Sequence, residues 1–376
     1  MDQSLRILII PDKFKGTITA GDAAKALARG WKRVRPNDSL TLLPMSDGGD
    51  GFGSQMSRVL GAKPRAIRTV DSAHRPQSAQ WWWDAKSRTA VIEAALVGGL
   101  ALLPPGKFHP FELDTFGLGA VFQAAAKAGA RRCFIGIGGS STNDGGFGLA
   151  RAVGWNFLDR EGNEILAWTR LHQLAKAIPP AQRISVSEIT VAVDVQNPLL
   201  GPRGCSRIYG PQKGLRPEDF PLAERALRRL ATVMKETTPR DYAKEPGAGA
   251  AGGLGFGLAA FLGARLEPGF GLFAAQAKLP DLLRRTDLVI TGEGSTDKSS
   301  LMGKGVGEIG ALCRRKKIPC MVISGVLNDL PKLSKVFTAV HALAPGFTSV
   351  REAKANPAHW LEKLASSVPG ELRISK

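Results

Sequence analysis

The chain is poor in cysteine and histidine, and both shortages exclude classes of site. Its four cysteines, Cys133, Cys205, Cys313 and Cys320, are spread through 376 residues without a CxxC pair. That spacing predicts reduced thiols and argues against a disulfide scaffold. The five histidines never stand at metal-ligand spacing, so we expect no zinc centre.

A long apolar segment is also lacking. The first residues run directly into a short apolar strand at residues 6–10 without the longer core of a signal peptide, which predicts a cytoplasmic location. Residues 246–264 carry no charge, but seven of them are glycine, so a helix there would present a poorly apolar surface to lipid. We expect a glycine-rich loop leading into a buried helix over residues 254–262, and no membrane partner.

Familiar nucleotide and hydrolase motifs are missing as well. Gly247, Gly249 and Gly252 spell GxGxxG, but the polar residues 241–246 before them do not form the strand that a Rossmann dinucleotide site needs. No GxxxxGK[ST] sequence occurs, which excludes a Walker A site, and no GxSxG elbow stands with a plausible histidine partner.

Acidic residues are outnumbered by basic ones, 33 to 51, which gives a formal net charge of +18. The basic residues are scattered in short clusters, the densest at residues 314–317, without interleaved aromatic residues. We interpret them as a solvated basic surface with no specific nucleic acid partner. A basic protein that binds polyanions without enzymatic activity is a remote alternative.

Glycine, by contrast, is abundant, and its 44 residues gather in a few loops. The most informative loop is GIGGSSTNDGG at residues 136–146, between two apolar segments. Its glycines allow backbone N–H groups to approach a phosphate, its hydroxyls add donors, and a helix beginning at Phe147 would point its positive end at the same place. The alternative is a tight strand-to-helix turn with its caps.

Apolar runs alternate with helical patterns at both ends of the chain. Residues 6–10 and 40–44 flank a helical pattern at 20–31, and further runs at 287–291, 319–324 and 339–344 surround one at 307–316. This alternation predicts an α/β fold with a parallel sheet covered on both faces.

The middle of the chain has a different texture, with strand candidates at 79–83 and 90–94 among long loops. We therefore predict two domains. Residues 1–65 and 280–376 form one discontinuous α/β domain, and residues 66–279 form a second α/β domain inserted into it. The triplet Trp81, Trp82 and Trp83 is expected to pack in the core rather than to form a recognition surface.

Every glycine- and aspartate-rich loop follows an apolar run, which is where parallel sheets place their ligand crevices. Taken singly, each aspartate could equally cap a turn or a helix. Together with the lysines they supply the groups that phosphoryl transfer requires, namely oxygen ligands for Mg²⁺ and positive charge for the transferred group. The residues concerned are Asp12, Asp47, Asp50, Asp144, Asp194, Glu293, Asp297, Lys13, Lys15, Lys213 and Lys304.

At these loops the chain resembles the type I glycerate kinase family, the glycerate 2-kinases, nearly end to end. The matching blocks are PDKFKG (11–16), PMSDGGDG (44–51), GIGGSSTNDGG (136–146), VDVQNPLLGPRG (193–204), YGPQKG (209–214), PGAGAAGGLG (246–255), LVITGEG (288–294) with Asp297, and GK (303–304). The resemblance implies a flavodoxin-like parallel-sheet domain interrupted by an inserted α/β domain, with the active site in the cleft. It also implies Mg²⁺-dependent transfer of the ATP γ-phosphoryl group to the 2-hydroxyl of glycerate, giving 2-phosphoglycerate and ADP.

The chain departs from the family where the substrate carboxylate could be bound. The family usually carries GEGRID followed two residues later by Gln, whereas here Ser295 and Thr296 precede Asp297 and Ser299 takes the Gln position. Arginine is a natural clamp for a carboxylate, and Lys13, Lys298 or Arg203 are candidates to replace it. The same chemistry on another small hydroxy acid is therefore the alternative function.

Residue chemistry and motif position give each candidate a predicted role. Asp194 is the predicted base for the substrate hydroxyl, and Lys213 is predicted to stabilise the transferring phosphoryl group. The predicted nucleotide and phosphate ligands are Gly138, Gly139, Ser140, Thr142, Asn143, Asp144, Lys13 and Lys15. The predicted substrate-binding residues are Asp47, Gly48, Gly49, Gly292, Glu293, Gly294 and Lys304. Asp47 and Asp297 are predicted to bind Mg²⁺ directly or through water, and the sequence leaves a homodimer open.

Overall fold

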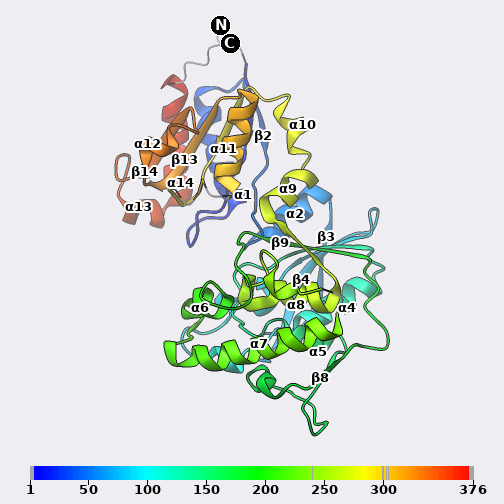
Figure 1. Ribbon diagram of the computed structural model, residues 1–376. Helices are drawn as coiled ribbons and strands as arrows, with labels where there is room; N and C mark the ends of the chain where they lie inside the picture. Colours follow the sequence, from blue (N-terminus) through cyan, green and yellow to red (C-terminus); the bar gives the residue numbers. More distant parts are fainter. Residues whose placement is uncertain (1–3, 239, 299, 302, 304, 372–376) are drawn as a thin grey trace. The chain divides into compact units, whose positions relative to one another are not determined.

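The computed structural model describes residues 4–238, 240–298, 300, 301, 303 and 305–371. The chain divides into two compact units (Figure 1). Unit 1 comprises residues 1–47 and 270–376, and unit 2 comprises residues 48–269. Each unit has its own sheet and its own hydrophobic core.

Unit 1 is built on a parallel sheet with the order β2-β1-β11-β13-β14, and the short β12 pairs with the end of β13. Counted along the chain without β12, this is the order 2-1-3-4-5, which is typical of flavodoxin-like doubly wound sheets. All five apolar runs predicted as strands near the ends of the chain are confirmed. The strands are β1 (Arg6–Ile9), β2 (Ser39–Leu42), β11 (Leu288–Thr291), β12 (Ser295–Thr296), β13 (Cys320–Leu327) and β14 (Ala339–Ala344).

Two long helices, α1 and α14, build the main core of unit 1 against the sheet. Helix α1 begins after Thr19, whose side chain caps the N–H of Asp22, and it buries Leu27 and Trp31. A Cβ built at Gly30 would lie 2.1 Å from the carbonyl oxygen of Glu362, so the two helices approach closely there. The helices of this unit are α1 (Ala20–Val34), α9 (Gly269–Gln276), α10 (Leu279–Leu283), α11 (Gly305–Lys316), α12 (Leu330–Leu333), α13 (Val350–Ala355) and α14 (Pro357–Ser367).

Unit 2 is built on a mixed sheet with the order β3-β4-β5-β6-β9-β10. The first three strands pair antiparallel, and β5, β6, β9 and β10 run parallel. A separate antiparallel pair is formed by β7 and β8. The strands are β3 (Lys63–Val70), β4 (Pro76–Asp84), β5 (Thr89–Glu93), β6 (Arg132–Gly136), β7 (Asn156–Leu158), β8 (Lys176–Ile178), β9 (Glu188–Val193) and β10 (Arg265–Pro268).

The three tryptophan side chains of β4 pack on both faces of this sheet. Trp81 and Trp83 lie in the main core of unit 2. Trp82 packs against Gly53, where a Cβ would lie 1.9 Å from its ring. The predicted core role is confirmed, because alternate residues of a strand point to opposite faces.

The helices of unit 2 are α2 (Phe52–Leu60), α3 (Ala95–Gly98), α4 (Leu118–Lys127), α5 (Phe147–Ala152), α6 (Cys205–Tyr209), α7 (Phe220–Thr237) and α8 (Ala250–Leu262).

The compact units divide at other residues than the predicted domain boundaries. The sequence prediction placed residues 48–65 with the first domain, but β3 pairs with β4 along its whole length, and α2 packs on β4 and β5. This segment therefore lies in unit 2. Residues 270–279, predicted to end the inserted domain, lie in unit 1.

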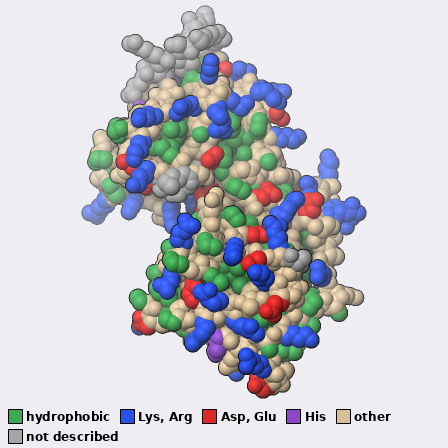
Figure 2. Space-filling view, in the orientation of Figure 1, with side chains coloured by type: hydrophobic (Ala, Val, Ile, Leu, Met, Phe, Trp, Pro, Cys, Tyr) green, Lys and Arg blue, Asp and Glu red, His purple; other side chains and the backbone are tan. Residues whose placement is uncertain are grey.

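The cysteines are reduced, and charged side chains of both signs lie on the surface. All four cysteines are free and buried. Figure 2 shows Lys and Arg side chains spread over the displayed face, with Asp and Glu side chains among them. None of the helices in the described ranges combines the length and the apolar character of a membrane span.

Candidate active site

The glycine-rich loop at residues 138–144, termed the phosphate loop below, leaves the carboxyl end of β6 and leads into α5. Gly139 is exposed and has a φ of +77°, and Gly146, with a φ of +76°, precedes Phe147 at the start of the helix. Ser140, Thr142 and Asn143 are buried. The glycine backbone at 138–139 is thus the accessible part of the loop, and its polar side chains lie behind it.

A neighbouring segment fixes the shape of the phosphate loop. The N–H of Ser141 donates to the carbonyl of Gly98 at 2.9 Å, and the N–H of Leu100 donates to the carbonyl of Gly139 at 2.9 Å. The hydroxyls of Ser72 and Ser141 lie 2.8 Å apart. These contacts hold the loop in one conformation, which suits a site that must present N–H groups to a ligand.

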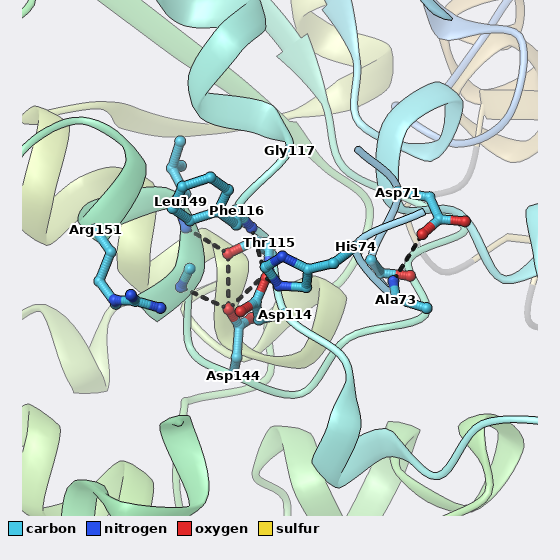
Figure 3. Close-up of polar contacts among 12 residues, drawn as sticks. Asp71, Ala73, His74, Asp114, Thr115, Phe116, Gly117, Asp144, Leu149 and Arg151 are labelled. Atoms are coloured by element: carbon cyan, nitrogen blue, oxygen red, sulfur yellow. Dashed lines mark hydrogen bonds and ion pairs between the residues drawn. The ribbon is translucent and has the colours of Figure 1, made fainter. Parts of the chain in front are cut away.

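The carboxylate of Asp144 is fully buried and faces Thr115 (Figure 3). Its Oδ2 accepts hydrogen bonds from the N–H of Thr115 at 2.9 Å, the hydroxyl of Thr115 at 2.7 Å and the N–H of Gly148 at 2.9 Å. Burial, and then the charge of Asp114, raise the pKa of Asp144. As a phosphate ligand Asp144 stays a prediction, and its side chain holds the start of α5.

Lys213 reaches the phosphate loop from the segment that follows α6. It ends the short 3-10 helix Pro211–Lys213, and it is buried. Its Nζ donates to the carbonyl of Thr142 at 2.5 Å. Burial lowers the pKa of Lys213 to about 8. The predicted phosphoryl-stabilising lysine and the predicted phosphate loop are therefore in direct contact.

A turn of residues with positive φ lies before the regular part of α8 and packs against the carbonyl of Thr142. Ala251, Gly252 and Gly253 have φ values of 55°, 70° and 87°, so the regular helix begins at Leu254, as predicted. A Cβ at Gly252 would lie 1.9 Å from the carbonyl oxygen of Thr142. Glycine adopts this conformation freely, so the steric cost falls on Ala251, and a strained residue of this kind is typical of functional sites.

The predicted substrate-binding glycines Gly48 and Gly49 lie beside the phosphate loop. The N–H of Gly138 donates to the carbonyl of Gly48 at 3.1 Å. A Cβ at Gly138 would lie 2.6 Å from the Cα of Gly49. Gly48 and Gly49, predicted to bind the substrate, thus lie directly against Gly138 of the phosphate loop.

Glu93 holds this contact in place, and the sequence analysis missed it. It ends β5, is buried, and accepts hydrogen bonds from the N–H groups of Gly51 at 2.8 Å and Gly53 at 2.9 Å. The only signal in the sequence was a carboxylate ending an otherwise apolar strand, at the edge where parallel sheets bind ligands.

Asp194, the predicted base, follows β9 directly and is exposed. Burial, and then the charge of Asp194, raise the pKa of Tyr209 to about 12. The hydroxyl of Tyr209 donates to Asn197 Oδ1 at 2.7 Å, and Asn197 Nδ2 donates to the carbonyl of Arg203 at 2.8 Å. Tyr209 and Asn197 thus give the loop that begins with Asp194 a defined shape.

Unit 1 gathers carboxylates at the corresponding edge of its own sheet. The N–H of Asp12 donates to the carbonyl of Gly292 at 2.8 Å, which joins the loops after β1 and β11. Burial, and then the charge of Asp47, raise the pKa of Asp12 to about 7, and Glu293 acts in the same direction. Asp12, Asp47 and Glu293 therefore form one acidic cluster, which we call the acidic loop cluster.

The other predicted residues of unit 1 surround this cluster or fall outside it. The N–H of Lys13 donates to Asp12 Oδ1 at 2.7 Å, and Lys15 is exposed. A Cβ at Gly294 would lie 3.3 Å from the N of Lys15, and one at Gly292 would lie 1.9 Å from the carbonyl oxygen of Ile323. Lys304 and Ser299 lie outside the described residues.

Asp297, the second predicted magnesium ligand, begins a turn after β12. Its Oδ1 accepts a hydrogen bond from the N–H of Ser300 at 3.4 Å. In the described part of the chain, no three Asp, Glu, His or Cys side chains form a group able to hold a metal ion by themselves. A cation here would need oxygen ligands from a substrate or from water.

Both units carry polar loops at the carboxyl ends of parallel strands. One set of loops offers carboxylates, and the other offers backbone N–H groups, hydroxyls and a buried lysine. This combination defines an α/β protein of the phosphoryl-transfer class.

Comparison with known proteins identifies the family. The model of the glycerate kinase family matches residues 7–372. A glycerate kinase of Halalkalibacterium halodurans is 35% identical over 371 residues, covering 96% of this chain and 97% of the relative. The glycerate 2-kinase of Escherichia coli K12 is 35% identical over 330 residues and 86% of both chains. A crystal structure of a candidate glycerate kinase 2 from Salmonella typhimurium LT2 superposes with a TM-score of 0.84 at 30% identity over 99% of both chains.

This chain belongs to the glycerate kinase family, and it is a kinase with ATP as its phosphoryl donor. The resemblance described from the sequence blocks is confirmed, as is the α/β fold with parallel sheets. Neither alternative, another hydroxy acid or a polyanion-binding protein without activity, finds support in the comparisons.

Proposed function

We propose that this enzyme transfers the γ-phosphoryl group of ATP to the 2-hydroxyl of glycerate, giving 2-phosphoglycerate and ADP. The observation that carries the proposal is the contact between buried Lys213 and the carbonyl of Thr142 in the phosphate loop, at the strand edge from which Asp194 also emerges. The family and its named relatives supply the substrate.

The substrate oxygen attacks the γ-phosphorus, and the bond from that phosphorus to the β,γ-bridging oxygen of ATP breaks. The proton of the hydroxyl passes to the carboxylate of Asp194, whose exposed position at the end of β9 leaves it open to a substrate. A positioned base of this kind contributes about 10²–10⁴-fold to the rate. ADP leaves with the electron pair of the broken bond.

The negative charge on the transferring group needs fixed positive partners. The ammonium of Lys213 and the N–H groups of the phosphate loop supply them. Because Lys213 is buried, its charge is poorly screened and acts strongly over short distances. The hydrogen bond to Thr142 keeps the ammonium at the loop before a ligand arrives.

Mg²⁺ is the proposed metal, held by Asp47 and Asp297 directly or through water. The acidic loop cluster fits such a cation, because its carboxylates lie close enough that the charges of Asp47 and Glu293 add to burial in raising the pKa of Asp12. Magnesium usually takes one or two carboxylates and completes its shell with phosphate and water, so the absence of a three-carboxylate group among the described residues is compatible with it. Bound there, it would neutralise charge on the phosphates of ATP.

Three further proposals concern the setting of the enzyme. We propose a cytoplasmic location. We also propose that the enzyme has no specific nucleic acid partner, since its basic residues are scattered along the chain and over the displayed face. A homodimer is to be tested by light scattering of the purified protein.

The proposal is tested by incubating the protein with Mg-ATP and D-glycerate, following ADP release and identifying the product by phosphorus NMR. Formation of 2-phosphoglycerate supports the proposal, and 3-phosphoglycerate would overturn the assigned hydroxyl. ADP release that appears only with another hydroxy acid in a substrate panel would overturn glycerate as the acceptor. Replacing Mg²⁺ with EDTA in the same assay should abolish turnover.

A further inference from the structure

The carboxylate of Asp50 lies against the accessible backbone of the phosphate loop. A Cβ built at Gly139 would lie 2.4 Å from Asp50 Oδ1 and 3.5 Å from Asp50 Cγ, so the carboxylate occupies the space that a side chain at Gly139 would need. Gly139 and Asp50 are both exposed. A ligand that reaches the backbone of Gly139 therefore also meets this carboxylate.

The short loop that carries Asp50 is fixed on both sides of this residue. Before it, the N–H of Gly138 donates to the carbonyl of Gly48 at 3.1 Å. After it, the N–H of Gly51 donates to Glu93 Oε1 at 2.8 Å. These contacts hold Asp50 beside the phosphate loop before a ligand arrives, which is the preorganisation that a binding site requires.

A carboxylate at this place opposes the binding of a bare phosphate. Two like charges about 4 Å apart weaken binding about fivefold even in bulk water, and more where solvent is excluded. The loop N–H groups and Lys213 favour a phosphate there, whereas Asp50 disfavours it. A divalent cation between the two anions removes this conflict, because carboxylate and phosphate oxygens are the ligands that Mg²⁺ prefers.

We propose that Asp50 is a ligand of the Mg²⁺ that accompanies the nucleotide, binding it directly or through water, so that the phosphate loop takes metal-bound nucleotide in preference to free nucleotide. The inference rests on the proposed function and adds a metal ligand from unit 2. A single carboxylate suffices, since Mg²⁺ usually completes its shell with phosphate and water. Asp144 cannot supply this ligand, because it is fully buried and its Oδ2 accepts from Thr115.

Removing the charge of Asp50 should act in opposite directions on two forms of the nucleotide. Asp50→Asn keeps the size of the side chain and loses its charge. Mg-ADP should bind about tenfold or more weakly, since even groups that only orient metal ligands typically contribute about 10–100-fold to metal affinity. ADP without metal should bind about fivefold more tightly, because the repulsion between the carboxylate and the phosphates is gone.

Isothermal titration calorimetry with ADP measures both effects in the wild type, Asp50→Asn and Asp84→Asn, once with excess Mg²⁺ and once with EDTA. Asp84→Asn is the matched control, because it removes the same charge where β4 pairs with Thr89, at the opposite end of β5 from Glu93. Its affinities should stay within about twofold of the wild type in both conditions, since salt screens distant surface charges. No acceptor is present, so the result holds whichever acid is phosphorylated.

A purely structural role of Asp50 predicts the same loss of affinity for ADP with and without Mg²⁺, and that result would overturn the inference. It would leave the proposed function intact. A wild type that binds no ADP in either condition would contradict the inference and the proposed function together.

Paramagnetic broadening gives a second test if Asp50→Asn does not fold. With ADP and Mn²⁺ in place of Mg²⁺ on the wild type, the amide NMR signals of Gly51 and Gly139 should broaden more than that of Lys86, next to the turn at Asp84. Equal broadening while ADP is bound would place the cation elsewhere and exclude Asp50 as its ligand.

Discussion

The two units present polar loops at the same edge of their parallel sheets, yet the loops carry opposite chemistry. In unit 1 the loops after β1, β2 and β11 bring Asp12, Asp47 and Glu293 together. In unit 2 the loop after β6 presents backbone N–H groups and a buried lysine. In both units the polar loops lie at the carboxyl ends of parallel strands. The residue types in these loops decide whether a cation or an anion can bind there.

The pKa values of the two regions show the same difference. Burial and the charges of Asp47 and Glu293 raise the pKa of Asp12 to about 7, against the opposing effect of Lys13. Burial lowers the pKa of Lys213 to about 8, because unit 2 buries a positive charge. A cation would stabilise the first arrangement, and a phosphate group would stabilise the second.

The largest expected effect tests the chemistry assigned to unit 2. Asp194→Asn should lower kcat by about 10²–10⁴-fold, since the amide cannot accept the proton of the substrate hydroxyl. Steady-state assays with Mg-ATP and glycerate measure it, with the melting temperature as the check on folding. A variant within about tenfold of the wild-type kcat would remove Asp194 from the role of base.

A second substitution separates backbone strain from the position of the phosphate loop. In Gly252→Ala the new Cβ would meet the Thr142 carbonyl at 1.9 Å, so the loop must move and kcat/KM for ATP should fall by about tenfold or more. Gly263→Ala is the matched control, because Gly263 has nearly the same φ, +69°, and open space around its Cβ position.

Both variants carry the cost of a left-handed alanine, about 1 kcal/mol. Only Gly252→Ala should change the kinetics with ATP. Equal kinetics in the two variants would show that the turn before α8 does not support the phosphate loop.

A third substitution tests the charge balance of unit 1 through stability. The pKa of Asp12 is raised in the folded protein, so between about pH 4 and pH 7 the folded state binds more protons than the unfolded state. Stability therefore falls as pH rises across this window, and the loss persists above it. Asp12→Asn should raise the melting temperature at pH 8 by about 2 °C or more and have little effect at pH 4.

Asp22→Asn in the same unit gives the contrast for Asp12. Hydrogen bonds from Lys25 and Thr19 lower the pKa of Asp22, so its charge stabilises the folded state above the unfolded pKa. Its substitution should lower the melting temperature at pH 8. The same sign of change in both variants would contradict the acidic loop cluster as a region of excess negative charge.

The smallest expected effect concerns His74, which is half exposed and forms an ion pair with Asp114. A hydrogen bond with Asp114 raises the pKa of His74, so its stabilisation is present below about pH 6.5 and is lost as pH rises through the raised value. Since the side chain is half exposed, the effect should stay below about 1 kcal/mol.

His74→Gln should accordingly remove a small stability difference between pH 6 and pH 9, measured by thermal unfolding. The control is His172→Gln, because the ring of His172 is hydrogen-bonded to the backbone carbonyl of Thr169 and not to a carboxylate. A larger pH effect from the control would assign the difference to another group.

The strands could be predicted because apolar runs of five or six residues were flanked by loops and helical patterns. The strand at 339–344 is β14, and the helix after the glycine-rich segment begins at Leu254 as expected. The compact units divide after Asp47 and not near residue 65, because β3 pairs with β4, which lies beyond that point of the chain. Sequence periodicity shows that a strand forms, but not which strand it joins.

By itself, the sequence determined which loops carry chemistry, since glycines, carboxylates and lysines stand where apolar runs end. Only the tertiary structure decided which side chains face the ligand side. Asp144 turns inward to Thr115, 29 residues away, and Lys213 meets Thr142, 71 residues away. Glu93 became visible only through its contacts with Gly51 and Gly53. The physical reason is that burial and hydrogen-bond partners, which set charge and orientation, come from residues distant along the chain.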